Sequence, residues 1–129
     1  MPSGGEGRIV LRETREEEKS PGEERWKDVS RLRELGRTAT EYLMIDLWDE
    51  DKKVRLAAID ALGSLKDTRA YEHLVPLLSD VDHDIRFATA VALGELGDSR
   101  AVVPLERACR DPNRYVRAAA LESIQKLRV

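Results

Sequence analysis

A chain of 129 residues, 41% hydrophobic and 36% charged, is long enough for one domain with a modest core and charged outer faces. The formal net charge is only −3, and neither residues 1–37 nor the remainder has the basic excess that nucleic-acid binding favours. A single cysteine excludes an internal disulfide, and no apolar run is long enough for a membrane span, so we expect a cytoplasmic protein.

Residues 1–20 consist mainly of Gly, Pro, Glu and Arg and contain little that a core could bury. Such a segment does not recover the entropy lost on ordering, so we predict a flexible charged tail. The folded domain is predicted to span 21–129. Its first predicted helix, 23–35, has charged side chains near positions that are apolar in later helices, as expected of a cap on a repeat array.

From Val54 onward the chain repeats with a period of 31 residues. The string Val-Arg-Leu-Ala-Ala at Val54 returns as Ile-Arg-Phe-Ala at Ile85 and as Val-Arg-Ala-Ala at Val116. Residues 54–84 and 85–115 share eleven identical positions. A fixed period of this length is typical of stacked supersecondary units.

Each repeat contains two helical patterns. The second places apolar or small residues at 54, 57, 58, 61, 62 and 65, which is a stripe along one side of a helix. Asp51, Asp82 and Asn113 precede the three copies at the position of an N-cap, and Thr38 and Glu41 have capping-box spacing for an earlier helix. The predicted helices are about 23–35, 39–48, 52–65, 68–79, 83–96, 99–110 and 114–127, in repeats about 38–65, 67–96 and 98–127.

The pattern Val-Arg-x-Ala-Ala-x-x-Ala-Leu-Gly, followed by Asp-x-Arg-Ala, Leu and a closing Asp, resembles the HEAT-like repeat. It is most similar to the short subtype named after phycobilisome lyase subunits, and the similarity covers roughly 38–129. This resemblance implies an all-α, armadillo-like solenoid of about three and a half stacked helical hairpins. The first helix of each hairpin would lie outside and the second would line a concave inner face. Function does not follow, because such repeats bind unrelated partners.

The same resemblance implies a ladder of hydrogen bonds between repeats, which this family commonly forms from an Asp before the second helix and an Arg at its start. The matching pairs, six residues apart in every copy, are Asp49 and Arg55, Asp80 and Arg86, and Asp111 and Arg117. We interpret all six as structural. The alternative is that three regularly spaced arginines bind an anion, but each arginine has its own carboxylate.

Residues suited to catalysis or metal binding are scarce. Two histidines, His73 and His83, and the one cysteine, Cys109, are too few for a zinc site, and Cys109 falls at an apolar repeat position. HEAT-like enzymes that hold iron with repeated His-Glu pairs are not matched, because Glu72-His73 occurs once and in reverse order. We therefore predict no enzyme, no cofactor and no metal.

The inner helices supply the binding hypothesis. Position 56 lies about 180° from the centre of the core stripe, where a solvated face should be polar, yet it holds Leu56 and, one repeat on, Phe87. Exposed apolar groups in a row mark contact sites. The candidate partner-binding residues are Trp26, Leu56, Ile59, Phe87, Val91 and Leu121. The alternative is that Leu56 and Phe87 only seal contacts between repeats, or that the folded tail or a second copy of the chain covers them.

We therefore predict a protein-interaction module or small scaffold with a protein or peptide partner, self-association being one form of it. A non-catalytic accessory subunit of an enzyme, as in lyase-like HEAT subunits, is the alternative. Nucleic-acid binding ranks last, because the outward positions read from the inner helices carry no basic residue. Only one Asn, one Gln and two Met beside abundant charge also favour a thermophilic source, with a melting temperature above about 80 °C.

Overall fold

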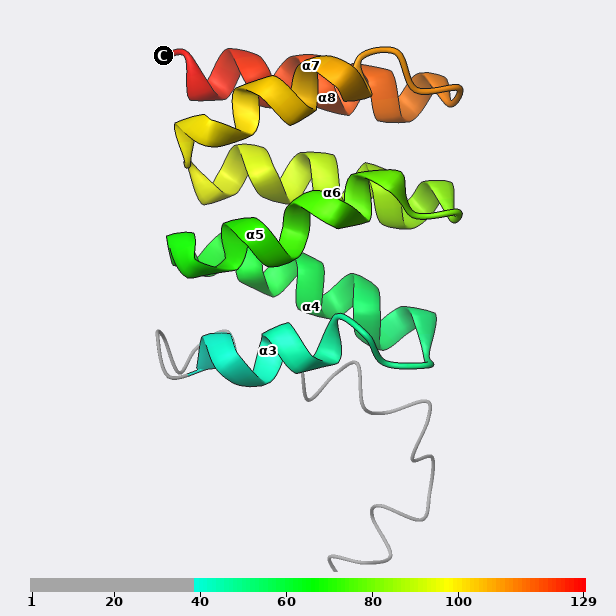
Figure 1. Ribbon diagram of the computed structural model, residues 1–129, viewed down its shortest axis with the longest axis vertical. Coiled ribbons are helices and arrows are strands. Elements are labelled where there is room, and N and C mark those ends of the chain that lie inside the picture. Colours follow the sequence, from blue (N-terminus) through cyan, green and yellow to red (C-terminus); the bar gives the residue numbers. More distant parts are fainter. Residues whose placement is uncertain (1–38) are drawn as a thin grey trace, which may run out of the picture.

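The computed structural model describes residues 39–129, which form a stack of helices without a strand in that part of the chain (Figure 1). The all-α solenoid prediction is confirmed. The predicted tail, the cap helix 23–35 with Trp26, and Thr38 lie outside the described residues. No helix in 39–129 is long and apolar enough to cross a membrane. In chain order the elements are α3 Thr40–Asp46, α4 Lys52–Leu65, η2 Thr68–Ala70, α5 Tyr71–Leu74, η3 Val75–Ser79, α6 His83–Leu96, η4 Ser99–Ala101, α7 Val102–Ala108 and α8 Arg114–Leu127.

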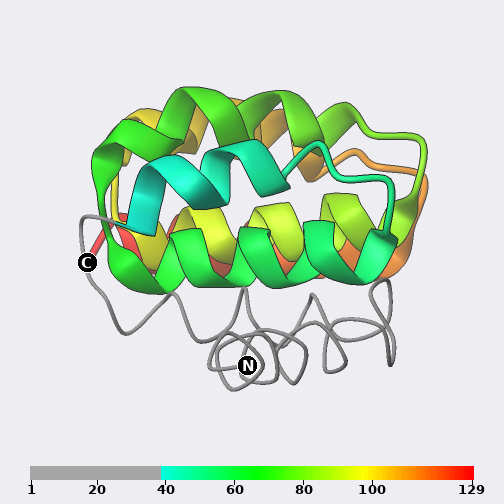
Figure 2. The ribbon, with the colours of Figure 1, turned by 90° about the horizontal axis from the view of Figure 1, so that it is seen from below.

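The helices form two layers (Figure 2). The outer layer consists of α3, then α5 with η3, then α7, while the long helices α4, α6 and α8 form the inner layer. The apolar stripes of both layers face each other and make the core. Its fully buried side chains include Leu43, Leu47, Val54, Leu62, Leu74, Ile85, Leu93, Leu105 and Val116.

All three inner helices begin at the predicted caps. The side chains of Asp51 and Asp82 accept hydrogen bonds from the backbone N–H two residues on, at 2.9 and 2.8 Å. Asn113 accepts from Tyr115 N at 2.8 Å and Val116 N at 3.2 Å. Each cap satisfies N–H groups that have no partner inside the helix, so the sequence itself sets where the inner helices start.

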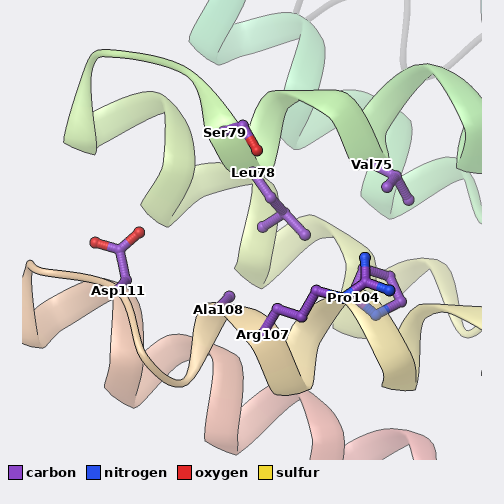
Figure 3. Close-up of a pocket in the computed structure, with 7 residues that line it drawn as sticks. All are labelled: Val75, Leu78, Ser79, Pro104, Arg107, Ala108 and Asp111. Atoms are coloured by element: carbon purple, nitrogen blue, oxygen red, sulfur yellow. The ribbon is translucent and has the colours of Figure 1, made fainter.

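The outer helix of the middle repeat changes character near Pro76. Helix α5 ends at Leu74 and the chain continues as the 3₁₀ segment η3, since proline has no N–H to donate and its ring crowds the preceding turn. Leu78 of η3 points toward α7, and Pro104 and Ala108 lie opposite it along a shallow hollow between the two outer elements (Figure 3).

The ends of α4 and α6 are both left-handed. Gly97 after α6 has φ 84°, while the equivalent residue after α4 is Lys66, with φ 57°. The Lys66 ammonium donates to the Glu95 carbonyl at 2.5 Å, so this helix end also reaches the next repeat.

Two glycines bring the inner helices close together. A Cβ at Gly63 would lie 2.9 Å from Ala92 Cα, and one at Gly94 would lie 2.7 Å from Ser123 Cβ. Both distances are too short for real atoms, so only glycine fits. The Ser123 hydroxyl uses the proximity to donate to the Ala90 carbonyl at 2.6 Å.

Candidate interaction surface

The free side of the inner layer carries a short apolar row. Phe87 of α6 is 42% exposed, and Leu56 of α4 and Val91 of α6 are half-buried. The equivalent of Leu56 and Phe87 in α8 is Ala118, which is also exposed. The largest exposed side chain of the row is therefore Phe87, in the middle of the described stack.

Ile59 does not belong to this row, and its assignment to the partner-binding residues is wrong, whereas Leu121 is exposed and stays a prediction. Ile59 is fully buried, because it lies one turn before Gly63 on the side of α4 that contacts α6. Leu121 and Ala90 are its repeat equivalents. Ala90 is buried against α8, whereas Leu121 is 53% exposed because no described helix packs on that side of α8. Leu121 thus lies at the end of the stack.

Acidic and basic groups are balanced around the apolar row. At 100° per residue, the positions within about 80° of it that the stacking leaves accessible are those equivalent to 52, 53, 60 and 64. These positions hold four basic residues, Lys52, Lys53, Arg114 and Lys126, and four acidic ones, Asp60, Asp84, Glu95 and Glu122. The inner face is consequently a surface of mixed charge with an aromatic residue near its middle.

The loops before the inner helices share one internal geometry. One carboxylate oxygen of Asp49, Asp80 and Asp111 accepts the backbone N–H two residues on, at 2.8 Å in every copy. The arginine six residues later donates through Nη1 to the backbone carbonyl of that same aspartate, and this distance is 2.7 Å in every copy. The Asp and Arg of the repeat motif thus shape the turn from outer to inner helix.

Arg86 extends this arrangement to the following repeat. Its Nε and Nη2 donate to the Asp111 carboxylate at 2.8 and 3.2 Å. Both side chains are largely buried, at 15% and 7% exposed. Burial raises the pKa of Asp111, but hydrogen bonds from Arg86 and from the Asn113 N–H outweigh it and hold the pKa below its ordinary value.

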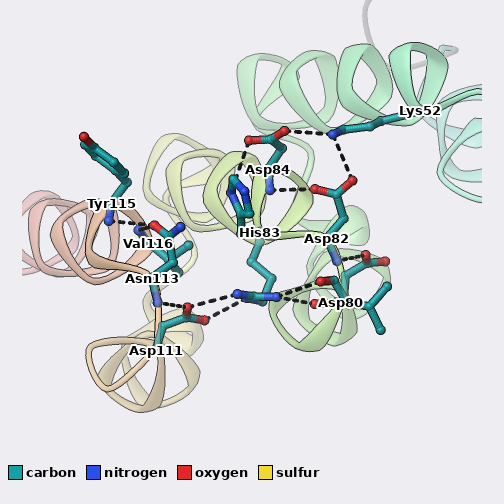
Figure 4. A network of polar contacts seen from close by, with 11 residues as sticks. Lys52, Asp80, Asp82, His83, Asp84, Asp111, Asn113, Tyr115 and Val116 are labelled. Atoms are coloured by element: carbon teal, nitrogen blue, oxygen red, sulfur yellow. Dashed lines mark hydrogen bonds and ion pairs between the residues drawn. The ribbon is translucent and has the colours of Figure 1, made fainter.

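The first junction between repeats is bridged by a lysine. Within the described residues, Arg55 donates only to the carbonyls of Asp49 and Glu50 and does not reach Asp80. Lys52 instead lies between the carboxylates of Asp84 and Asp82, at 2.7 and 2.9 Å (Figure 4). The pKa of Lys52 is raised by Asp84 and then by Asp82, and that of Asp82 is lowered by Lys52.

A second polar contact crosses the outer layer. Asp67, whose side chain is 5% exposed, accepts from Arg69 Nη2 at 2.7 Å and from the Thr40 hydroxyl at 3.0 Å. Hydrogen bonds from Arg69 hold the pKa of Asp67 far below its ordinary range despite its burial. One repeat on, Asp98 binds Arg100 in the same way, and the Arg100 guanidinium lies 4.2 Å from the centre of the Tyr71 ring.

The repeat geometry agrees with a sequence comparison: the family described as HEAT repeats matches residues 37–125. The chain belongs to the HEAT repeat family. No curated protein matches it. HEAT repeats commonly mediate contacts between proteins, and the stack gives them an extended surface for this purpose.

The HEAT stack does not gather the chemistry-bearing side chains at one place. His73 and His83 are exposed on different elements, and Cys109 is half-buried at the end of the outer layer. Residues 39–129 contain no group of three His, Cys, Asp or Glu that could hold a metal ion. The hollow between η3 and α7 measures about 190 Å³, which is below the roughly 300–1,000 Å³ of small-molecule sites.

The outermost HEAT helix of the described stack carries a feature that the sequence analysis missed. Tyr42, Ile45 and Trp48 of α3 and its C-terminal turn are 64%, 71% and 65% exposed. Their spacing of three residues, offset from the core residues Leu43 and Leu47, was a signal available in the sequence.

Proposed function

We propose that this HEAT repeat chain is a protein-interaction module that binds an extended or helical segment of a partner on its inner face and carries out no catalysis. The exposure of Phe87 in the middle of the inner layer carries the proposal. A large aromatic side chain held by a rigid helix costs little entropy to bind, and such residues dominate the energetics of interfaces.

The surroundings of Phe87 define the partner's chemistry. Four basic and four acidic side chains flank the row, so the segment that fits has an apolar anchor with charged residues of both signs beside it. An amphipathic helix with anchors one turn apart meets both requirements. We place this interaction in the cytoplasm, where the single Cys109 would stay reduced.

The test is affinity capture from the source organism with the wild-type chain and with Phe87→Glu as baits, followed by quantitative mass spectrometry. Because Phe87 is exposed, we expect the variant to keep its melting curve and to lose at least one protein that the wild type enriches. The matched control is Val81→Glu, which adds the same charge at a 99% exposed loop residue away from the inner face.

Partners lost with Phe87→Glu and kept with Val81→Glu support the inner face as the binding surface. If both variants and the wild type capture the same proteins equally well, the inner-face assignment is wrong. The captured protein then supplies the peptide for a direct titration, in which added salt should weaken binding because the flanking charges are exposed.

A further inference from the structure

The outer face of α3 is apolar and acidic at the same time. Tyr42, Ile45 and Trp48 are all about two-thirds exposed, which is unusual for three large side chains on one turn-and-a-half of helix. Residues 40–51 contain five carboxylates and no basic residue, with Glu41 and Glu50 both exposed. Tryptophan and tyrosine are the residue types most enriched at the energetic centres of interfaces.

The equivalent face of α7, two repeats further on, has the opposite character. Val103, Arg107 and Arg110 there occupy the positions of Glu41, Ile45 and Trp48. All three are exposed, Val103 by 55%. Arg107 borders two shallow hollows, one toward η3 that Leu78 and Pro104 line (Figure 3), and one that Val103 and Arg110 line.

This difference extends along the whole stack. Residues 39–97 contain six basic and twelve acidic side chains, whereas residues 98–129 contain seven basic and four acidic ones. The acidic end of the stack in one molecule therefore attracts the basic end of the stack in a second molecule. Between them, the equivalent residues of the middle repeat are Glu72, Pro76 and Ser79, which are exposed.

We propose that two copies of this chain associate through their outer-helix layers as an antiparallel, two-fold symmetric dimer. In this arrangement the α3 face of each copy contacts the α7 face of the other, and the two-fold axis passes near Pro76. One symmetry operation forms both complementary contacts, and two-fold dimers are the commonest protein assembly. The inner faces stay free, so the dimer presents two separate binding surfaces for the partner proposed above.

The chemistry of each contact already occurs inside the chain. The Arg100 guanidinium lies 4.2 Å from the centre of the Tyr71 ring across a repeat junction. Arg107 and Arg110 can cover the exposed rings of Tyr42 and Trp48 in the same manner, beside the two shallow hollows that Arg107 borders. Each copy contributes ten residues of these outer positions, four on α3 and its turn, three in the middle repeat and three on α7 and its turn. This is fewer than the roughly 20–30 residues a side of a standard interface, so we expect a weak dimer that depends on concentration.

The first experiment is analytical ultracentrifugation of the full chain over a series of concentrations. A dimer of twice the 14.6 kDa chain mass should appear as concentration rises and should dissociate in about 1 M salt, where screening acts within about 3 Å. Trp48→Ala should raise the dissociation constant at least tenfold. Phe87→Ala removes an exposed aromatic from the inner face instead and should leave self-association unchanged.

The second experiment exchanges the charges. Glu41→Lys in one chain and the double substitution Arg107→Glu with Arg110→Glu in another each place like charges in both halves of the dimer. Each variant alone should be monomeric with an unchanged circular dichroism spectrum. In a mixture, one contact is native and the other has its charges reversed, so the two variants should form a heterodimer.

A wild-type chain that stays monomeric at all concentrations overturns the proposal. So does a dimer that Phe87→Ala weakens as much as Trp48→Ala, or a mixture of the charge variants that stays monomeric. Recovery of association only in the mixture supports it, and this outcome does not depend on whether the inner face binds a partner.

Discussion

The two junctions between successive hairpins have the same backbone geometry and different polar contacts. At both, a glycine of one inner helix contacts the next inner helix, Gly63 with Ala92 and Gly94 with Ser123. At the second junction Arg86 and Asp111 form a largely buried bidentate pair. At the first junction the connection is Lys52 with Asp82 and Asp84, on side chains that are 26% to 53% exposed.

The repeat motif determines some contacts of the junctions and leaves others free to vary from copy to copy. Glycine spacing and the capped loops are common to both junctions, because they follow from backbone hydrogen bonds and close packing. The ion pair between the motif arginine of one repeat and the motif aspartate of the next occurs at the second junction and, within the described residues, not at the first. Arg55 and Asp80 nevertheless stand at the positions of Arg86 and Asp111. Three carboxylates, at 80, 82 and 84, gather at the first junction, and Lys52 is the group that bridges two of them.

The largest effect should come from the feature that both junctions share. Gly94→Leu should lower the free energy of unfolding by about 3 kcal/mol, the upper end of the cost of overpacking, because the new side chain meets Ser123. Urea unfolding measures the change. Ser64→Leu, which adds the same side chain at an exposed site on α4, serves as the control. Equal changes in the two variants would show that the helices separate without cost.

The buried pair of the second junction should come next. Arg86→Ala should cost about 1–3 kcal/mol, since the largely buried Asp111 carboxylate keeps only its hydrogen bond from the Asn113 N–H and a loop carbonyl loses its donor. Arg55→Ala removes only loop contacts and should cost less. If the two substitutions destabilise the chain equally in urea, the contact with Asp111 adds nothing to the shared loop contacts.

The folded chain should be less stable in acid than at neutral pH. The pKa values of Asp111 and Asp67 are lower in the folded chain than in the unfolded one, so the folded state gains stability from both carboxylates above the unfolded value of about 3.9. That stability decreases as the pH falls below this value. Unfolding free energies measured from neutral pH into acid should show a shallower decline for Asp111→Asn than for the wild type; parallel curves would contradict the contribution of Asp111.

The smallest effect should come from the exposed pair at the first junction. Lys52→Ala should lower the melting temperature slightly at low salt and not at all in about 1 M salt, because exposed ion pairs are screened and contribute little. Thermal melts at the two salt concentrations test this. A salt-independent loss as large as that of Arg86→Ala would make the two junctions equivalent after all.

Much of the fold could be predicted from the sequence because its determinants are local. The caps Asp51, Asp82 and Asn113 fix the helix starts, and the 31-residue period fixes the stacking. Ile59 was misassigned because a helical wheel drawn for one helix shows only the stripe toward the outer layer. Stacking buries a second side of each inner helix, and that side depends on a neighbour 31 residues away.

The surfaces were harder to predict than the core. Phe87 was identified because its helix has a clear stripe, and its exposure agrees with the position assigned to it. Tyr42, Ile45 and Trp48 were missed because the seven residues of α3 give too short a pattern to separate core from surface. Likewise, the family resemblance implied a ladder between repeats from three Asp–Arg pairs, but the reach of an arginine side chain depends on neighbouring charges that differ from one copy to the next.

The residue at the left-handed end of α4 combines an unfavourable backbone conformation with a contact to the next repeat. A residue with a Cβ costs about 1–2 kcal/mol in this conformation, which Gly97 avoids at the end of α6 and Lys66 does not. In return the Lys66 ammonium binds the Glu95 carbonyl near the end of the next inner helix. Replacing Lys66 with glycine would remove the unfavourable backbone conformation and also the hydrogen bond to the Glu95 carbonyl. The first hairpin would then fold and unfold more independently of the next repeat.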